Sequence, residues 1–198
     1  MKEFWNERYS DQEYAYGKEP NQFFKRALDR MKPGKLLLPA EGEGRNAVYA
    51  ATLGWEVVAF DYSEEAKQKA LTLAQEYNVN IHYEVSSAEK MNLPEGEFDA
   101  AALVFVHFPN EIFEPFLKNV INSLKSGGIL IIEGYSDKQL GRDSGGPKSR
   151  DLLYNYDVFR SLLTDVKVDL YEEKEVHLTE GKYHRGEAVV IRAVATKK

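Results

Sequence analysis

Two glycines and an aspartate are the residues of this 198-residue sequence whose types and spacing point most directly to chemistry. Gly42 and Gly44 form a tight turn after the apolar run at 35–39, and their lack of a Cβ atom lets the backbone approach a ligand closely. A helix predicted to open at Arg45 directs free N–H groups and a partial positive charge over the turn. Asp61, at the end of the next apolar run, offers two carboxylate oxygens for the two hydroxyls of a ribose. The sequence therefore predicts a nucleoside-cofactor site.

The turn is compatible with two classes of cofactor. Gly42, Gly44 and Ala47 satisfy the dinucleotide fingerprint, with Asp61 where the ribose-binding acid stands, but the same turn also suits S-adenosylmethionine. The C-terminal pattern favours S-adenosylmethionine, because dinucleotide folds normally end in a parallel strand and this chain ends in two strand patterns with no helix between them. An NAD(P)-binding oxidoreductase remains the alternative, together with a protein that binds S-adenosylmethionine without catalysis.

Strand and helix patterns alternate along the middle of the chain and must position these residues. The predicted strands cover residues 35–39, 56–60, 81–85, 98–106 and 129–133. The predicted helices cover residues 45–53, 64–77 and a segment that starts near Glu114-Pro115 and stops before Gly127. A short helix at 156–163 and two strands at 166–176 and 188–195, joined by the turn-rich linker 178–187, complete the pattern.

This alternation predicts an α/β fold with a Rossmann-like sheet, helices on both faces and an antiparallel hairpin at the end. The whole chain, 1–198, is interpreted as a single domain. Its parts are an N-terminal cap segment at 1–34, a cofactor-binding core at 35–135, and a lid loop followed by the C-terminal hairpin at 136–198. The lid is expected at 136–150, because that stretch is polar, rich in glycine and too long for an ordinary connector.

The composition excludes several classes of function. There are no cysteines, which removes disulfides, thiolate nucleophiles and cysteine metal sites. The net charge of −6 argues against a nucleic-acid partner, and no apolar stretch is long enough for a membrane partner. The four histidines lack metal-ligand spacing, so no metal site is expected. The polar N-terminus does not read as a signal peptide, and we expect a cytoplasmic protein that acts on a small molecule.

Several short motifs, weak when taken singly, resemble in their order and spacing those of class I S-adenosylmethionine-dependent methyltransferases. The resemblance is closest to the small tellurite-resistance and thiopurine-methyltransferase-like group and covers essentially the whole chain. Besides the glycine turn and the terminal hairpin, the motifs are Trp5…Arg8-Tyr9…Tyr16-Gly17…Pro20-Asn21, Asp61-Tyr62-Ser63, Asn92-Leu93-Pro94 before Phe98-Asp99, Val106-His107-Phe108-Pro109, and Leu124-Lys125-Ser126-Gly127-Gly128.

The resemblance implies a seven-stranded methyltransferase sheet of order 3-2-1-4-5-7-6 with only strand seven antiparallel, and S-adenosyl-L-methionine as cofactor. The cofactor-binding residues that it implies are Tyr16, Ala40, Glu41, Gly42, Gly44, Asp61, Tyr62, Ala88, Glu89 and Val104.

The glycine turn departs from the family pattern at two positions. Leu38 replaces an acidic residue that often orients the turn, and Glu41 or Glu43 is a possible substitute for it. Ala40 replaces a glycine, which is tolerable if its φ is negative.

Several of these side chains also have a plain structural interpretation. Tyr62 either covers one face of adenine or is a core tyrosine, and Glu89 either reads the adenine amino edge or is a surface charge. Arg45 either pairs with the methionyl carboxylate or lies on the surface.

The aromatic N-terminus allows two interpretations. Aromatic faces attract a sulfonium much as they attract an ammonium, so Trp5, Tyr9, Tyr14 and Tyr16 either form a flap over the cofactor or merely anchor the segment.

Methyl transfer by displacement needs a base only when the acceptor must lose a proton. No residue is identified as an obligatory base. The catalytic candidates are His107, Tyr135 and His184, and Glu133 is a fourth polar side chain expected to face the acceptor. No motif names the acceptor.

Overall fold

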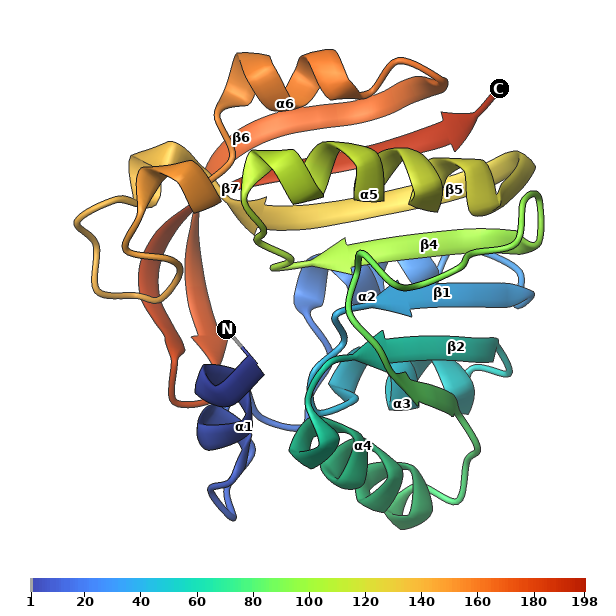
Figure 1. Ribbon diagram of the computed structural model, residues 1–198, viewed down its shortest axis with the longest axis vertical. Coiled ribbons are helices and arrows are strands. Elements are labelled where there is room, and N and C mark those ends of the chain that lie inside the picture. The colour runs from blue at the N-terminus through green and yellow to red at the C-terminus, as the bar shows by residue number, and fades with distance from the viewer. Residues whose placement is uncertain (1) are drawn as a thin grey trace.

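The computed structural model describes residues 2–198, which form one seven-stranded sheet with helices on both faces (Figure 1). The strands are β1 (Lys35–Pro39), β2 (Glu56–Asp61), β3 (His82–Val85), β4 (Phe98–Val104), β5 (Leu124–Tyr135), β6 (Val166–Glu180) and β7 (His184–Lys197). The helices are α1 (Lys2–Tyr9), α2 (Gln22–Leu28), α3 (Arg45–Thr52), α4 (Glu64–Glu76), α5 (Asn110–Ser123) and α6 (Tyr156–Leu162), with short 3₁₀ turns η1 (Asp137–Gln139) and η2 (Arg150–Leu152).

The strand order is β3-β2-β1-β4-β5-β7-β6, as predicted. The first five strands are parallel, and β7 runs antiparallel to both β5 and β6. The parallel strands all end at the left-hand edge of the sheet in Figure 1, so the residues that follow them meet there. This edge is where open α/β sheets bind their ligands.

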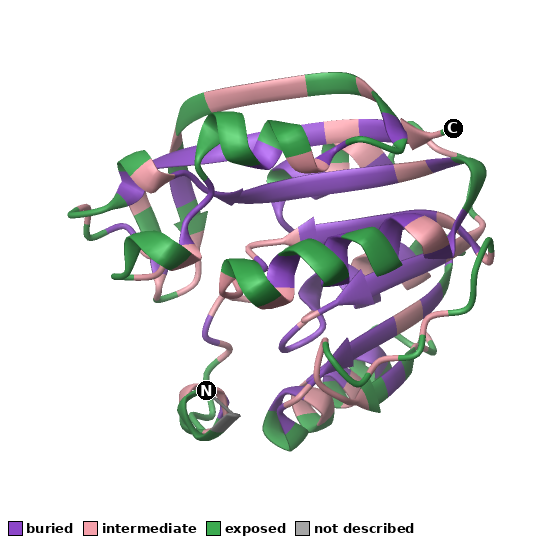
Figure 2. Cartoon of the chain, turned by 45° about the horizontal axis from the view of Figure 1, so that its top comes forward, coloured by how far each residue is buried: buried purple, intermediate pink, exposed green. Residues whose placement is uncertain are grey.

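Two apolar layers, one on each face, hold the helices against the sheet. Along β1, Leu37 packs into the layer beneath α5, whereas Leu36 and Leu38 pack into the layer beneath α2 and α3. The alternation follows from the two-residue period of a strand. Figure 2 shows the central strands buried along most of their length, while the outer faces of the helices are exposed. Within residues 2–198, no helix is both long and apolar enough to span a membrane.

Several predicted boundaries are wrong, among them the start of β5, which lies at Leu124 and not at residue 129. Helix α5 begins at Asn110 and not near Glu114, so Pro115 lies inside it. The helix persists because Phe113, Phe116 and Val120 bury one face, which outweighs the single backbone hydrogen bond that the proline lacks. The linker predicted at 178–187 is largely strand, because β6 and β7 keep pairing from Val176 to Glu180.

The N-terminal segment contains a helix that the sequence pattern did not predict. Helix α1 covers residues 2–9, and residues 10–20 then cross the carboxyl edge of the sheet before α2. We call residues 2–20 the N-terminal strap. Asn21 follows the strap and caps α2, because its side-chain oxygen accepts the N–H of Phe24 at 2.9 Å.

Gly44 is fixed by both backbone and packing, and its replacement by alanine is expected to destabilise the protein by about 2–4 kcal/mol. Its φ is +86°, and a Cβ atom there would lie 2.6 Å from the Cβ of Ala70. Gly127 is the matched control, because its φ is +79° but a Cβ atom would meet nothing within 4 Å. Gly127→Ala should therefore cost only the backbone strain, about 1–2 kcal/mol. Urea denaturation measures both, and equal losses would contradict the packing argument.

Candidate cofactor and acceptor site

Asp61 joins the end of β2 to the glycine turn. Its Oδ2 accepts the N–H of Gly42 at 3.2 Å, and its Oδ1 accepts the N–H of Ser63 at 3.0 Å. From the next strand, the hydroxyl of Tyr83 donates to the carbonyl of Gly42 at 2.5 Å. Burial raises the pKa of Asp61 to about 6, because the carboxylate has left water without gaining a cation. The turn and Asp61 are thus one hydrogen-bonded unit.

Glu41 orients the turn in place of the acid missing at position 38, where Leu38 is buried in the core. The Oε1 of Glu41 accepts the N–H groups of Asn46 and Ala47 at 2.9 and 2.8 Å, which satisfies two free donors at the start of α3. Burial raises the pKa of Glu41 to about 7. The condition under which alanine is tolerable at position 40 is not met: the φ of Ala40 is +49°, a conformation that favours glycine.

Glu43 ties the glycine turn to the strap. Its Oε2 accepts the N–H of Ala15 at 2.8 Å, and its Oε1 pairs with the ammonium of Lys69 on α4 at 2.7 Å. Lys69 also donates to the carbonyl of Glu13 at 2.7 Å. The backbone of the strap is therefore held by a residue of the turn that it covers.

The aromatic residues of the strap lie over and beside the turn. Tyr9 is buried, and its hydroxyl sits so close to Gly42 that a Cβ atom there would lie 2.8 Å away. Trp5 stacks on Tyr9 with ring centroids 5.4 Å apart, and the hydroxyl of Tyr14 donates to the carbonyl of Lys69 at 3.1 Å. These contacts anchor the strap, and they also place aromatic faces next to the turn.

Four rings form an aromatic cluster where β4, β5, β7 and the strap meet. The ring of His184 lies 4.3 Å from that of Tyr16, 4.4 Å from that of Phe105 and 5.4 Å from that of Tyr135. Phe105 has a φ of +54°, a strained conformation that places its ring in the cluster directly after β4. Phe105 was missed by the sequence analysis, because nothing local to VFVH signals that strain.

A buried polar network fixes this cluster from the side of the hairpin. The amide of Asn21 donates to Glu133 at 2.6 Å and to Glu180 at 3.0 Å. Glu133 also accepts from Arg192, and Glu180 pairs with Arg45 at 2.8 Å. Arg45 is therefore buried rather than a surface residue, and its guanidinium is already paired.

The three catalytic candidates differ in what their polar atoms contact. Both ring nitrogens of His107 are used: Nδ1–H donates to the carbonyl of Leu152 at 2.7 Å, and Nε2 accepts the N–H of Tyr135 at 3.1 Å. Burial lowers its pKa to about 4, so this ring is neutral and has no free lone pair. Tyr135 is buried, and burial raises its pKa.

His184 begins β7 and is not the linker residue that was expected. It is buried, and its Nδ1 lies 3.5 Å from Glu180 and makes no hydrogen bond within the described residues 2–198. Burial is the main cause of its lowered pKa. Unlike His107, His184 thus keeps an unpaired nitrogen.

The residues expected near an adenine follow β2, β3 and β4. Tyr62 is half-buried, and burial together with the Asp61 charge raises its pKa to about 12. Ala88 and Val104 are half-buried, and Glu89 is exposed. Next to Ala88, the Oγ of Ser87 is buried and has no hydrogen-bond partner among residues 2–198.

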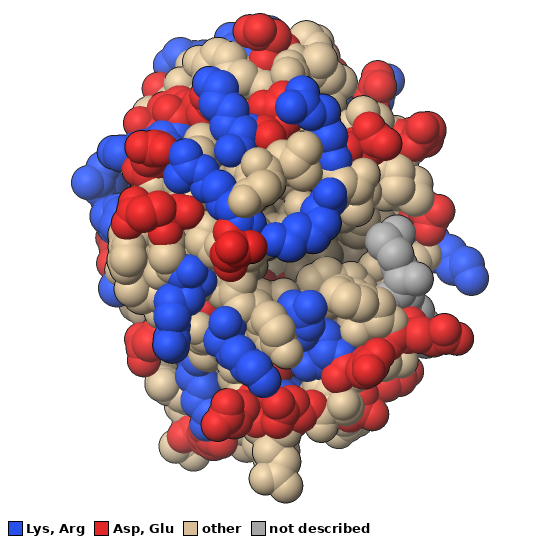
Figure 3. Space-filling model, turned by 90° about the vertical axis from the view of Figure 1, so that its left-hand side faces the viewer, with Lys and Arg blue, Asp and Glu red and all other residues tan. Residues whose placement is uncertain are grey.

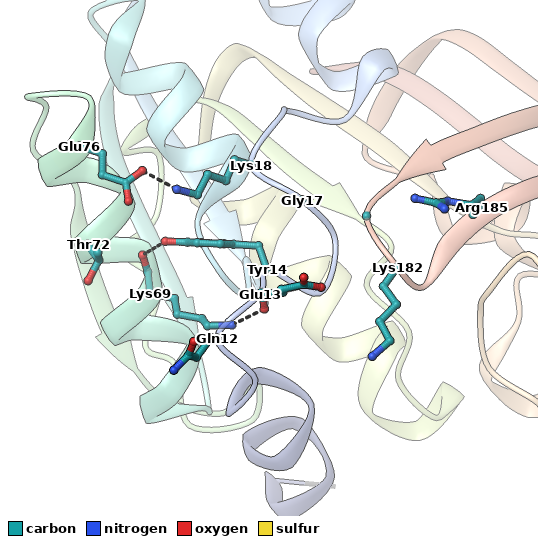
Figure 4. Close-up of a pocket in the computed structure, with 11 residues that line it drawn as sticks. Gln12, Glu13, Tyr14, Gly17, Lys18, Lys69, Thr72, Glu76, Lys182 and Arg185 are labelled. Atoms are coloured by element: carbon teal, nitrogen blue, oxygen red, sulfur yellow. Dashed lines mark hydrogen bonds and ion pairs between the residues drawn. The ribbon is translucent and has the colours of Figure 1, made fainter.

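Two features mark the surface around this edge. Viewed onto the carboxyl edge, the molecule is hollowed near its centre, with Lys and Arg side chains gathered around the hollow (Figure 3). A cavity of about 860 Å³ lies between the strap, α4 and the β6–β7 turn (Figure 4). Lys18, Lys69, Lys182 and Arg185 line it, and Lys18 pairs there with Glu76 at 2.6 Å.

The predicted lid is held against the hairpin by Gln139. The Oε1 of Gln139 accepts the N–H of Val189 at 2.9 Å, and its Nε2 donates to Ser144 at 2.9 Å and to the carbonyl of Gly145 at 3.0 Å. The loop lies beside the carboxyl edge, as its exit from β5 implies (Figure 1).

Comparison with known proteins bears on the identity of this site. Residues 39–128 match the family described as a methyltransferase domain. An uncharacterized methyltransferase of Schizosaccharomyces pombe is 27% identical over 100 residues, which are 50% of this chain and 69% of that protein. A probable S-adenosyl-L-methionine-dependent methyltransferase of Haemophilus influenzae, TehB, is 26% identical over 103 residues, 52% of this chain and 36% of TehB.

Solved structures agree in fold. The crystal structure of Haemophilus influenzae TehB covers 100% of this chain and 67% of its own, with a TM-score of 0.75 and 20% identity. A protein solved in work on the conversion of a disulfide bond into a thioacetal group during echinomycin biosynthesis covers 100% and 92%, with a TM-score of 0.79 and 17% identity.

The matched domain and these relatives support a class I S-adenosylmethionine-dependent methyltransferase. Within that class they support a relation to TehB and S-adenosylmethionine as the cofactor.

Proposed function

We propose that this methyltransferase transfers the methyl group to a small-molecule acceptor, and that the cofactor lies over the turn at Gly42–Gly44. The observation that carries the cofactor placement is the hydrogen bond from Gly42 N–H to Asp61, which brings a carboxylate to the mouth of the turn. One oxygen lone pair of Asp61 serves each backbone N–H, and the carboxylate retains others for ribose hydroxyls.

The residues around the turn fit S-adenosylmethionine. The unpartnered Oγ of Ser87 lies next to Ala88, at the end of the strand beside Asp61, where an adenine would extend from the ribose. Tyr62 and Glu89 flank that position, and Tyr16 is one of the four rings of the aromatic cluster. Ala40, Glu41, Gly42, Gly44 and Val104 complete the proposed cofactor-binding set.

When bound, S-adenosylmethionine supplies an electrophilic methyl group on a sulfonium. The residues of the protein must then align the acceptor with that methyl group and exclude water. The rings of Tyr16, Phe105, Tyr135 and His184 offer an apolar and polarizable wall for this. For an acceptor that must lose a proton, His184 has the unpaired nitrogen, whereas His107 would first have to give up two backbone hydrogen bonds.

A small acceptor is supported by the compact site. The aromatic cluster is enclosed by the strap and the hairpin, and residues 2–198 form a single sheet with its covering helices. The test is transfer of labelled methyl from S-adenosylmethionine to a panel of small thiols, amines and oxyanions, run beside protein and RNA fractions. Labelling confined to macromolecules would refute the proposed acceptor class.

The strap is expected to gain protection from hydrogen exchange when cofactor binds, because closure over the turn excludes water from the site. Hydrogen exchange of residues 5–17 and of the loop 136–150 should slow in the presence of S-adenosylhomocysteine, while α5 serves as the internal control. Equal exchange of residues 5–17 with and without ligand would show that the strap is fixed packing and not a gate.

A further inference from the structure

Arg8 is a half-buried cation of the strap whose charge meets no carboxylate. Two other cations near the cofactor turn are paired, Arg45 with Glu180 at 2.8 Å and Lys69 with Glu43 at 2.7 Å. In the part of the chain that the structure describes, Arg8 forms no salt bridge, and its guanidinium contacts aromatic side chains instead. A charge withdrawn from water needs some such compensation.

Aromatic rings take the place of the missing carboxylate. The guanidinium carbon of Arg8 lies 3.8 Å from the centroid of the Tyr183 ring, 4.9 Å from that of Phe4 and 6.0 Å from that of Trp5. Its Nη1 also donates to the hydroxyl of Tyr16 at 3.3 Å. Aromatic faces attract a cation, and the planar guanidinium stacks on a ring as an ammonium cannot. Of the rings that hold Arg8, that of Tyr183 is the nearest.

The stacking of Arg8 on Tyr183 joins two parts of the chain that are far apart in sequence. Arg8 lies on α1 within the strap, whereas Tyr183 lies in the β6–β7 turn, directly before His184. The strap also meets this turn through the backbone, where the N–H of Lys182 donates to the carbonyl of Ala15 at 3.0 Å. Arg8 adds a side-chain contact from α1, so the helix itself is docked on the hairpin.

Tyr16 links this contact to the aromatic cluster. Its ring lies 4.3 Å from that of His184 and 6.2 Å from that of Tyr183, while its hydroxyl accepts from Arg8. Displacement of Arg8 would therefore release the hydroxyl of Tyr16 together with the ring of Tyr183. The position of one wall of the cluster thus depends on a residue outside it.

We propose that Arg8 is a positioning residue, which latches the strap onto the β6–β7 turn and holds Tyr16 in the aromatic cluster. The inference rests on the proposed function, in which the cofactor lies beneath the strap and the acceptor meets the methyl group at the cluster. A latch made of a cation and rings suits a strap that opens for ligand exchange, because such a contact is weaker than a buried salt bridge. When the strap opens, the guanidinium returns to water.

The dissociation rate of S-adenosylhomocysteine from the full chain, measured by stopped flow, tests the latch. In Arg8→Met and in Tyr183→Leu the rate should rise about 10-fold, because either change removes the cation–π contact. The double variant should release the ligand no faster than either single variant, since the two residues act as one unit. Arg8→Lys keeps the charge but not the planar stack, and its rate should lie between those of the wild type and Arg8→Met. Arg26→Met, which removes an exposed cation of α2, is the matched control and should leave the rate unchanged.

Hydrogen exchange of the ligand-free protein gives a second readout that does not depend on the cofactor. Residues 5–17 should exchange faster in Arg8→Met than in the wild type, while the exchange of α5 and the midpoint of urea denaturation stay unchanged. Faster exchange in α5, with a lower midpoint, would overturn the latch in favour of a general contribution to stability.

Two further outcomes overturn the inference. One is a wild-type dissociation rate in Arg8→Met, and the other is a double variant in which the effects of Arg8→Met and Tyr183→Leu add. If Arg8→Met does not fold, an unchanged rate in Arg8→Lys overturns the inference equally. Failure of the wild type to bind S-adenosylhomocysteine would instead refute the proposed cofactor site, and the exchange of residues 5–17 would still test the latch.

Discussion

Replacing Asp61 by alanine is expected to weaken S-adenosylmethionine binding about 10- to 150-fold, which corresponds to about 1.5–3 kcal/mol. The carboxylate is the group proposed to receive the ribose hydroxyls, and its hydrogen bond to Gly42 also fixes the turn at 3.2 Å. Both contributions disappear in Asp61→Ala. Titration calorimetry measures the affinity, and circular dichroism checks that the variant is folded.

The control for this experiment is Glu84→Ala. Glu84 is exposed and pairs with Phe60 in the sheet register. Its replacement therefore removes a carboxylate from the adjacent strand without touching the turn. Its cofactor affinity should stay within about twofold of the wild type. Unchanged binding by Asp61→Ala, or tight binding of NAD to the wild type, would contradict the assignment of Asp61.

Replacing Arg192 by methionine is expected to destabilise the fold by about 3–5 kcal/mol. The variant keeps most of the volume of the side chain but leaves Glu133 buried without its cation, with only Asn21 as a partner at 2.6 Å. Urea denaturation at pH 7 measures the loss. The double variant Glu133→Gln with Arg192→Met should recover a large part of it, because no unpaired charge remains.

The loss in Arg192→Met should shrink as the pH falls. Burial already raises the pKa of Glu133 in the wild type, and removal of Arg192 raises it further, so the folded state binds a proton that the unfolded state releases. Stability of the variant therefore rises relative to the wild type between pH 7 and pH 5. A constant difference over this range would show that lost packing, and not the unpaired charge, causes the destabilisation.

The sheet was predictable because its signals are local. The strands β1, β2 and β4 are apolar runs that are each followed by a turn and an amphipathic helix, and the absence of a helix between β6 and β7 requires an antiparallel pair. The order of the strands came from the resemblance, which added what periodicity alone does not contain.

The errors arose where tertiary contacts outweighed local preference. Pro115 suggested a helix start, but the apolar face shared by Phe113, Phe116 and Val120 extends the helix to Asn110. The polar residues of 178–187 suggested a linker, but pairing across the hairpin extends both strands. Ala40 adopts a positive φ because the turn around Asp61 requires it.

The candidate site, like the fold, was predictable where its signals are local and was missed where distant residues pair. The glycine turn and Asp61 lie within twenty residues of one another, so their spacing could be recognised. Arg45 is paired with Glu180, and Glu133 with Arg192, across 135 and 59 positions of the chain. No local pattern reports such partners. The one available signal was that charged residues stand in or beside strands that are otherwise apolar.

The strap and the β6–β7 turn bring opposite ends of the described chain together. The N–H of Lys182 donates to the carbonyl of Ala15 at 3.0 Å, and a Cβ atom at Gly181 would lie 2.5 Å from the N atom of Gly17. Within this sequence the strap is synthesised long before the hairpin that receives it. The parallel strands can assemble earlier, but the covered site cannot. A nascent chain therefore completes the covered site only after the β6–β7 hairpin has been synthesised.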